Sequence, residues 1–301
     1  MTVLVAGATG TTGSAVLDQL LATGVPVRAL TRSTGKAAQL ARRGVESVVA
    51  DLTDGTDREV AGLRRALTGI TAAYLVTPSA PGMAAIEGRF AQAAAGAGVH
   101  VVKLSTLGAD SGSPLRFGRV HAEAEAAIEA AGGSWTFLQP NGFMQNDLAW
   151  AAQVPGGTIA GPVMDAAWSI VDVRDVAAVA AAVLTDPAAH TGRRIPVTGR
   201  EPRTPRDRVA ALAAVLGRDL TPVDVPVPTV LDQLRGHGLP AWQVDGLGEL
   251  LAFYADGGTT GRATWVAPDF DGLLASPRRR WEDFVTDHQD RFLPPTPPGR
   301  P

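Results

Sequence analysis

Three glycines spaced three residues apart follow a short apolar run at the start of the chain, and this arrangement constrains the fold most. The apolar run covers residues 3–6, the glycines are Gly7, Gly10 and Gly13, and a helical pattern continues to Ala22. A strand, a glycine turn and a helix in this order predict a dinucleotide-binding site. In such a site the first glycine permits the tight turn, the second lets the backbone approach a pyrophosphate, and the third lets helix and strand pack closely.

The start of the predicted helix offers free backbone N–H groups and the positive end of the helix dipole to phosphate groups. We therefore expect the nucleotide to contact the turn and the first helical residues, which are Gly7, Thr9, Gly10, Thr11, Thr12 and Gly13. The spacing is GxxGxxG, one residue wider at its start than the more common GxGxxG pattern. The alternative is a glycine-rich turn without a ligand.

The composition is that of a globular protein, with 301 residues, 45% hydrophobic content, a net charge of −3 and no cysteine. This charge does not favour nucleic acid or a membrane as a partner, and no apolar run approaches the roughly 18 residues of a membrane span. Without cysteine the chain has no cysteine-ligated metal site, and its histidines share no metal-ligand spacing, so we expect no metal. The start lacks the basic segment of a signal peptide, which favours a cytoplasmic location.

Short apolar runs alternate with helical patterns through the first 140 residues. We predict strands at 3–6, 27–31, 47–50, 72–76, 101–105 and 136–139, and helices near 12–23, 35–43, 57–67, 82–97 and 117–131. This alternation predicts an α/β fold, a Rossmann-like doubly wound parallel sheet. Ligands of such sheets bind at the carboxyl ends of the strands, so the residues just after each strand are the candidates for function.

Beyond Pro140 the alternation stops, and helices near 172–184, 204–216, 226–236, 240–255 and 277–289 are joined by segments rich in proline and glycine. We expect an NAD(P)-binding domain over residues 1–153, with 169–186 returning to it. Residues 154–168 and 187–294 are expected to form a smaller, mostly helical C-terminal substrate lobe. Residues 295–301, rich in proline, are expected to be a disordered tail.

Charged residues follow the second and third predicted strands. Arg32 stands where NAD enzymes usually carry an acidic residue for the ribose 2′-OH. Its planar fork of donors suits a 2′-phosphate instead, with help from Lys36, so NADP(H) is favoured over NAD(H). After the third strand, Asp51 is expected to accept a hydrogen bond from the adenine amino group, with Leu52 against the ring; alternatively, Asp51 caps the next turn.

The fourth and fifth predicted strands end in residues that we expect near the nicotinamide. The backbone of Thr77 and Pro78 is expected to run under the nicotinamide ribose. Ser105 or Thr106 is expected to face the nicotinamide, where its hydroxyl group would hold a substrate oxygen. The alternative for both hydroxyls is capping of the strand end.

Several short motifs follow one another along the chain in the order that is typical of one protein family. They are GATGTTG, TRS, DL, VTP, LST and LQPNGFMQN. In these motifs the chain resembles the atypical short-chain dehydrogenase/reductases, and among them the NmrA-like branch. Within that branch it is similar to the ergot-alkaloid-reductase-like (festuclavine/agroclavine dehydrogenase-type) group, which includes bacterial members. Residues 169–187 and 281–288 are similar to later segments of the same group. The resemblance implies a Rossmann-like fold and a nicotinamide cofactor, and leaves the substrate open.

The chain departs from this resemblance at the catalytic pair. Short-chain dehydrogenases usually carry Tyr-x-x-x-Lys, but neither Tyr74 nor Tyr254 has a lysine four residues later. Where related plant reductases place a catalytic lysine, this chain has His121, with Glu125 one helical turn on. His121 is expected to orient the nicotinamide ribose or to deliver a proton near neutral pH. The alternative is a buried structural histidine.

The segment after the sixth predicted strand is expected to flank the carboxamide side of the nicotinamide through Pro140, Asn141 and Phe143. With Phe143, Met144 would form an apolar wall. Asn146 would either bind substrate or cap the helix that follows.

Each aromatic side chain of the second lobe, such as Trp168 or Tyr254, is by itself expected in the core, but together they indicate an apolar or aromatic substrate. The hypothesis is an NADPH-dependent reductase, a monomer or homodimer, that reduces an activated acceptor such as an imine/iminium, a quinone or an enone, in secondary metabolism. Two alternatives stay open: a non-catalytic NADP(H) sensor, as the NmrA resemblance allows, and a non-redox biosynthetic enzyme.

Overall fold

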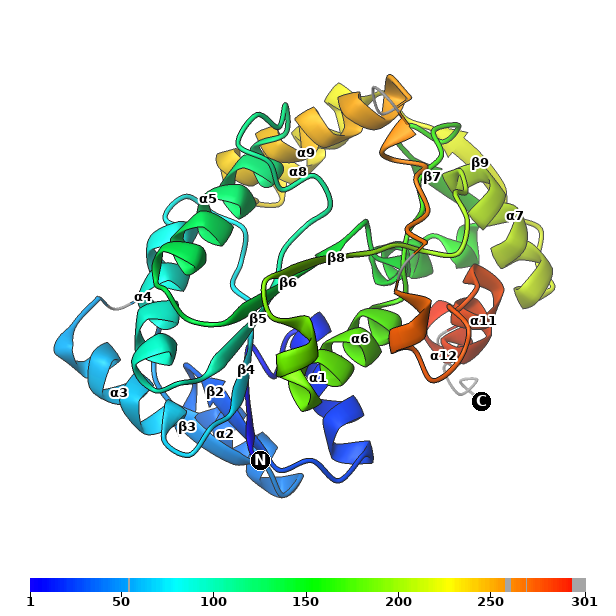
Figure 1. Cartoon of the computed structure of the whole chain (residues 1–301). Helices are drawn as coiled ribbons and strands as arrows, with labels where there is room; N and C mark the ends of the chain where they lie inside the picture. The colour runs from blue at the N-terminus through cyan, green and yellow to red at the C-terminus, as the bar shows by residue number, and fades with distance from the viewer. Residues whose placement is uncertain (54, 258–260, 269, 294–301) are drawn as a thin grey trace. The chain divides into compact units, whose positions relative to one another are not determined.

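The structure is a computed structural model that describes every residue except 54, 258–260, 269 and 294–301 (Figure 1). The predicted tail at 295–301 lies outside the described residues. The contacts divide the chain into two compact units. Unit 1 comprises Met1–Pro140, Val173–Val197 and Pro268–Pro277, and unit 2 comprises Asn141–Asp172, Thr198–Ala267 and Arg278–Pro301.

The first stretch of unit 1 ends at Pro140, whereas the sequence analysis expects a boundary at residue 153. The chain after Pro140 forms 3-10 turns rather than a regular helix, η1 over Met144–Ala152 and η2 over Val154–Gly156. Met144 and Val154 belong to the apolar core of unit 2. The packing of these two side chains explains why the segment belongs to unit 2.

Unit 1 is built on a parallel sheet of seven strands in the order β3-β2-β1-β4-β5-β6-β8. The strands are β1 Val3–Ala6, β2 Val27–Thr31, β3 Glu46–Val49, β4 Ala72–Leu75, β5 His100–Leu104, β6 Trp135–Pro140 and β8 Arg193–Val197. The sheet confirms the six predicted strands, each shifted by a residue at most at either end. The strand order reverses between β1 and β4, which is where ligands of doubly wound sheets bind.

The strand β8 was not predicted. Its sequence, RRIPV, begins with two arginines and contains Pro196, so it lacks the apolar run of a buried strand. Pro196 pairs with Gln139 at the edge of the sheet. An edge strand has one unpaired side, where a proline without an N–H group is tolerated.

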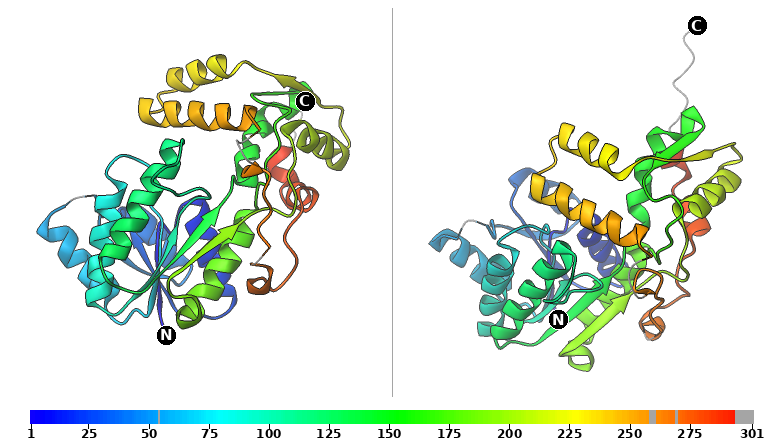
Figure 2. Two further views of the ribbon diagram at one scale, coloured as in Figure 1. Left: turned by 45° about the horizontal axis from the view of Figure 1, so that its top comes forward. Right: turned by 90° about the horizontal axis from the view of Figure 1, so that it is seen from above.

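Helices cover both faces of this sheet (Figures 1 and 2). Helix α1 packs on α6, and α4 packs on α5 and α3. The helices of unit 1 are α1 Thr11–Ala22, α2 Thr34–Arg42, α3 Asp57–Leu67, α4 Met83–Gly96, α5 Arg116–Ala130 and α6 Val173–Thr185, with short turns η3 Pro187–His190 and η4 Asp271–Leu273. All four residues of β1 and of β4 are buried, as expected of strands covered on both sides.

Unit 2 has its own apolar core. Phe284 and Phe292 are fully buried, and Val209 and Leu212 from α7 join the same cluster. Its elements are β7 Thr158–Gly161, α7 Pro205–Leu216, β9 Thr221–Asp224, α8 Val227–Gly236, α9 Ala241–Ala255, α11 Trp281–Asp287 and α12 Gln289–Phe292. The strands β7 and β9 pair in parallel and were not predicted. The predicted helix at 277–289 begins only at Trp281.

Among the described residues, no helix is both long enough and apolar enough to cross a membrane.

We expect Gly13→Ala to destabilise unit 1. A Cβ atom at Gly13 would lie 2.2 Å from the carbonyl oxygen of Gly7, a backbone atom, so the clash could be relieved only by shifting α1 from β1. Such overpacking typically lowers the free energy of unfolding by about 1–3 kcal/mol. Urea denaturation of the variant and the wild type measures this loss.

The matched control is Gly96→Ala in helix α4, where a Cβ atom would meet nothing within 4 Å. Alanine is the better helix former by about 1 kcal/mol, so this variant should be as stable as the wild type or slightly more stable. Equal denaturation midpoints for the two variants would contradict the close approach at Gly13.

Candidate functional site

The turn between β1 and α1 leaves backbone donors at one edge of the sheet. Gly7 has φ +71°, and the N–H of Gly10 donates to the Gly7 carbonyl over 2.8 Å. Helix α1 then begins at Thr11 with Gly10 as its N-cap, and no side chain caps it. The first N–H groups of α1 are therefore left for a ligand, and the glycines leave room for it. The backbone of this turn fits the pyrophosphate of a dinucleotide.

The other predicted cofactor residues of unit 1 follow strands of the same sheet. Their positions are Arg32 and Lys36 after β2, Asp51 and Leu52 after β3, Thr77 and Pro78 after β4, Ser105 and Thr106 after β5, and Pro140 at the end of β6. Because parallel strands end at one edge, these residues share the edge with the glycine turn. Asn141, Phe143, Met144, Asn146, Trp168 and Tyr254 belong to unit 2.

Asp51 caps its own turn. Its Oδ1 accepts hydrogen bonds from the backbone N of Thr53 over 2.9 Å and from the Thr53 hydroxyl over 2.7 Å. These bonds, and then the positive charge of Arg32, hold the pKa of Asp51 below its usual value although burial opposes them. This is the capping alternative of the sequence analysis, and the contact of Asp51 with adenine stays a prediction. Leu52 is buried in the core of unit 1.

A buried ion pair lies inside unit 1, near the carboxyl end of β5. Lys103 of β5 and Glu87 of α4 are both fully buried, and Nζ lies 2.9 Å from Oε2. The Thr77 hydroxyl donates to the other oxygen of Glu87 over 2.7 Å. Burial raises the pKa of the Glu87 carboxyl, and the charge of Lys103 opposes this rise. Neither residue was among the functional candidates predicted from the sequence.

His121 of α5 is 7% exposed and connects this pair to the loop after β4. Its Nδ1 lies 3.2 Å from Nζ of Lys103, and its Nε2 lies 2.9 Å from Oγ of Ser79. Burial, and then the charge of Lys103, holds the pKa of His121 well below its usual value. The imidazole is therefore neutral near pH 7, and any proton that it delivers comes from a neutral ring N–H.

Ser105 takes part in a second buried cluster around Glu125 of α5. The Ser105 hydroxyl donates to Oε1 of Glu125, which also accepts from Nε2 of Gln139 over 3.0 Å. Arg194 of β8 donates to Oε2 over 2.9 Å. The proton of Ser105 thus points at a carboxylate within the protein, and its contact with a substrate stays a prediction.

Most of the cofactor and substrate residues that were predicted in unit 2 make contacts within this unit. Trp168 stacks on Tyr254 with ring centroids 4.4 Å apart, and burial raises the pKa of Tyr254 to about 12. Met144 is 3% exposed. Asn141 donates through its side chain to the carbonyl of Ala263 over 3.1 Å. Phe143, not the exposed Asn146, is the N-cap of η1, and no side chain caps this turn.

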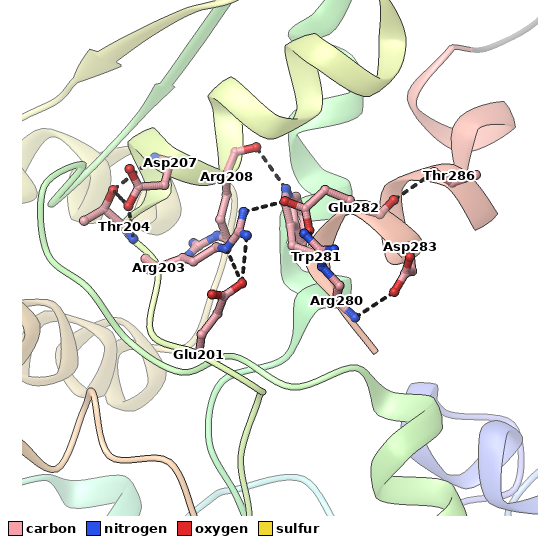
Figure 3. A network of polar contacts seen from close by, with 10 residues as sticks. All are labelled: Glu201, Arg203, Thr204, Asp207, Arg208, Arg280, Trp281, Glu282, Asp283 and Thr286. Atoms are coloured by element: carbon pink, nitrogen blue, oxygen red, sulfur yellow. Dashed lines mark hydrogen bonds and ion pairs between the residues drawn. The ribbon is translucent and has the colours of Figure 1, made fainter. Parts of the chain in front are cut away.

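Unit 2 also contains a hollow lined by several arginines, and two of these, Arg203 and Arg208, pair with carboxylates. Figure 3 shows the polar contacts around Arg203. Arg203 contacts Glu201 and Glu282, each over 2.7 Å. Arg208 is 2% exposed, and its Nε lies 2.8 Å from Oδ2 of Asp147. These pairs join the start of α7 to α11 and η1, so the two guanidinium groups stabilise the core of unit 2.

Two known reductases are similar to this protein over nearly the whole chain. An NAD(P)H azoreductase of Xenophilus azovorans is 33% identical over 292 residues, which are 96% of this chain and 99% of the azoreductase. A (4-alkanoyl-5-oxo-2,5-dihydrofuran-3-yl)methyl phosphate reductase of Streptomyces griseus is 37% identical over 300 residues, which are 97% of this chain and 99% of that protein.

Among solved structures, an NADPH-dependent quinone oxidoreductase from Escherichia coli in complex with NADPH superposes with a TM-score of 0.78 at 27% identity. The match covers 95% of this chain and 99% of that one. The model of the NmrA-like family matches residues 1–270 of the 301. This match, together with two relatives more than 30% identical over nearly their whole length, shows that the chain belongs to the NmrA-like family.

Proposed function

We propose that this protein is an NADPH-dependent reductase that transfers a hydride to an activated small organic acceptor. The observation that carries the proposal is the uncapped start of α1 beside the glycine turn, at the point where the strand order reverses. The names of the relatives support it, since they include an azoreductase, a reductase of an unsaturated lactone phosphate and a quinone oxidoreductase.

Residues of unit 1 would hold the cofactor along the sheet edge. The N–H groups of Thr11, Thr12 and Gly13 would bind the pyrophosphate. Arg32 and Lys36 are exposed just after β2, and within the described part of the chain neither side chain makes an ion pair. Their two positive charges suit a 2′-phosphate, which favours NADP(H) over NAD(H).

The nature of the acceptor follows from the chemistry that the chain lacks. The bound nicotinamide would supply a hydride, and no tyrosine-lysine pair is present to protonate the alkoxide of a plain ketone. An iminium ion needs only the hydride, because it already carries a positive charge. A quinone, an azo compound or a conjugated enone gives a stabilised anion that a weaker proton donor can neutralise. Such acceptors are the proposed substrates, with apolar or aromatic ones favoured.

We expect the purified protein to oxidise NADPH in the presence of at least one of four acceptors: a quinone, an azo compound, a cyclic iminium ion and a conjugated enone. The measurement is the loss of NADPH absorbance, with cofactor binding followed in parallel by fluorescence. Tight NADPH binding without turnover on any acceptor would contradict the reductase and favour the non-catalytic NADP(H) sensor.

We expect Arg32→Ser to weaken NADPH binding while NADH binding stays the same, because only NADPH carries the 2′-phosphate. A hydrogen bond to a charged group contributes about 1.5–3 kcal/mol, so the dissociation constant for NADPH should rise about ten- to a hundredfold. The matched control is Arg64→Ser on the exposed surface of α3, which should change neither constant. Equal weakening of NADPH and NADH would exclude Arg32 as the residue that selects the cofactor.

A further inference from the structure

We propose that Ser79 is the proton donor to the reduced acceptor, and that His121, Lys103 and Glu87 behind it are positioning residues that replace its proton. This inference rests on the proposed reductase function. Its basis is a continuous line of polar contacts from a fully buried ion pair to a partly exposed hydroxyl group.

The direction of each hydrogen bond in this line follows from the lysine. An ammonium group has three hydrogens and can only donate. Nζ of Lys103 meets three acceptors: Oε2 of Glu87 at 2.9 Å, the Leu104 carbonyl at 3.1 Å and Nδ1 of His121 at 3.2 Å. Because Nζ can only donate, Nδ1 of His121 must be the unprotonated ring nitrogen.

The tautomer of His121 then determines the role of Ser79. Because Nδ1 accepts, the single proton of the neutral ring sits on Nε2, which donates to Oγ of Ser79 over 2.9 Å. Ser79 accepts from the imidazole and keeps its own O–H for another partner. Within the described part of the chain, no acceptor for this O–H is found.

The place of Ser79 in the fold fits a donor. It follows Thr77 and Pro78 in the loop after β4, one of the two strands between which the strand order reverses, and it is partly exposed. Ser105 contrasts with it, since the Ser105 hydroxyl donates to Glu125 and is 4% exposed. Of these two hydroxyls near the strand ends, the one on Ser79 is free to donate outward.

The proposed step is balanced in protons and electrons. The acceptor receives two electrons with the hydride and one proton from Oγ of Ser79. Oγ takes the proton of His121 Nε2, and Nδ1 of His121 takes one proton from Nζ of Lys103. Lys103 is then neutral beside the Glu87 carboxylate until solvent returns a proton. No bond other than O–H and N–H bonds changes along this line.

The first test compares two acceptor classes in Ser79→Ala. Reduction of a conjugated enone needs a proton and should slow about a hundredfold or more, as is typical when a general acid is lost. Reduction of an iminium ion needs no proton and should keep its rate, and NADPH binding should be unchanged. Equal rates for wild type and variant with the enone, or equal slowing with both acceptors, would overturn the role of Ser79.

The matched control is Ser134→Ala, which removes another serine–histidine hydrogen bond from unit 1. Oγ of Ser134 lies 3.1 Å from Nδ1 of His100, which is the first residue of β5. This contact therefore lies at the amino ends of the strands, whereas Ser79 follows the carboxyl end of β4. This variant should reduce both acceptors at the wild-type rate.

The second test does not depend on activity. Nitrogen NMR of histidine-labelled protein, without cofactor, should show His121 as a neutral ring protonated on Nε2 at neutral pH. His121→Gln should slow enone reduction but not iminium reduction, since glutamine offers an N–H but cannot pass a proton through a ring. A ring protonated on Nδ1 would overturn the line of contacts. Failure of the wild type on every acceptor would instead overturn the proposed function, and the role of Ser79 with it.

Discussion

The contact between the glycine turn and helix α1 positions everything else proposed for the cofactor. A side chain at Gly13 would lie 2.2 Å from the Gly7 carbonyl, so only glycine lets α1 begin this close to the end of β1. This close approach places the start of α1 at the carboxyl ends of β1 and β4, the two strands between which the strand order reverses. Once the pyrophosphate is placed there, the neighbouring strands determine the rest. The end of β2 presents Arg32 on one side, and the ends of β4 and β5 present hydroxyl groups on the other.

The buried pair of Lys103 and Glu87 is hard to explain by stability alone. Removing two charges from water costs several kcal/mol for each ion, and an apolar pair of similar volume is often as stable or more stable. The pair is tolerated because its polar groups find partners: Nζ of Lys103 contacts Glu87, the Leu104 carbonyl and His121, and the second oxygen of Glu87 accepts from Thr77. A charge that stability does not require, in line with a neutral imidazole and a partly exposed hydroxyl, favours a role in moving protons.

Periodicity and strand-end rules predicted the sheet of unit 1 well, because most of its first six strands are buried apolar runs, although β3 at the edge of the sheet is partly exposed. They did not predict β8, whose Arg194 pairs with Glu125 and Glu129 and whose Pro196 lies in an edge strand. The line of polar contacts from Glu87 to Ser79 could not be predicted from the sequence for a different reason. Its members come from α4, β5, α5 and a loop, and the sequence does not show which faces of α4 and α5 meet. A lysine inside an otherwise apolar strand was the one available signal, because a charge at such a position must find a buried partner.

Ser79 and its supporting residues also account for the choice of acceptor. In the usual tyrosine-lysine pair the ammonium group acts directly on a phenol, which is acidic enough to protonate an alkoxide. Here Tyr74 lies within β4, where burial raises its pKa above the ordinary value, so it is a poor donor. The ammonium of Lys103 instead acts through an imidazole on a serine, which is a weaker acid and can give up its proton only while it receives another. Such a donor suits anions that are already stabilised, as those formed from enones, azo compounds and quinones are, and it is not needed for an iminium ion. In the proposed mechanism, the residues that replace the missing pair would therefore limit the reductase to activated acceptors.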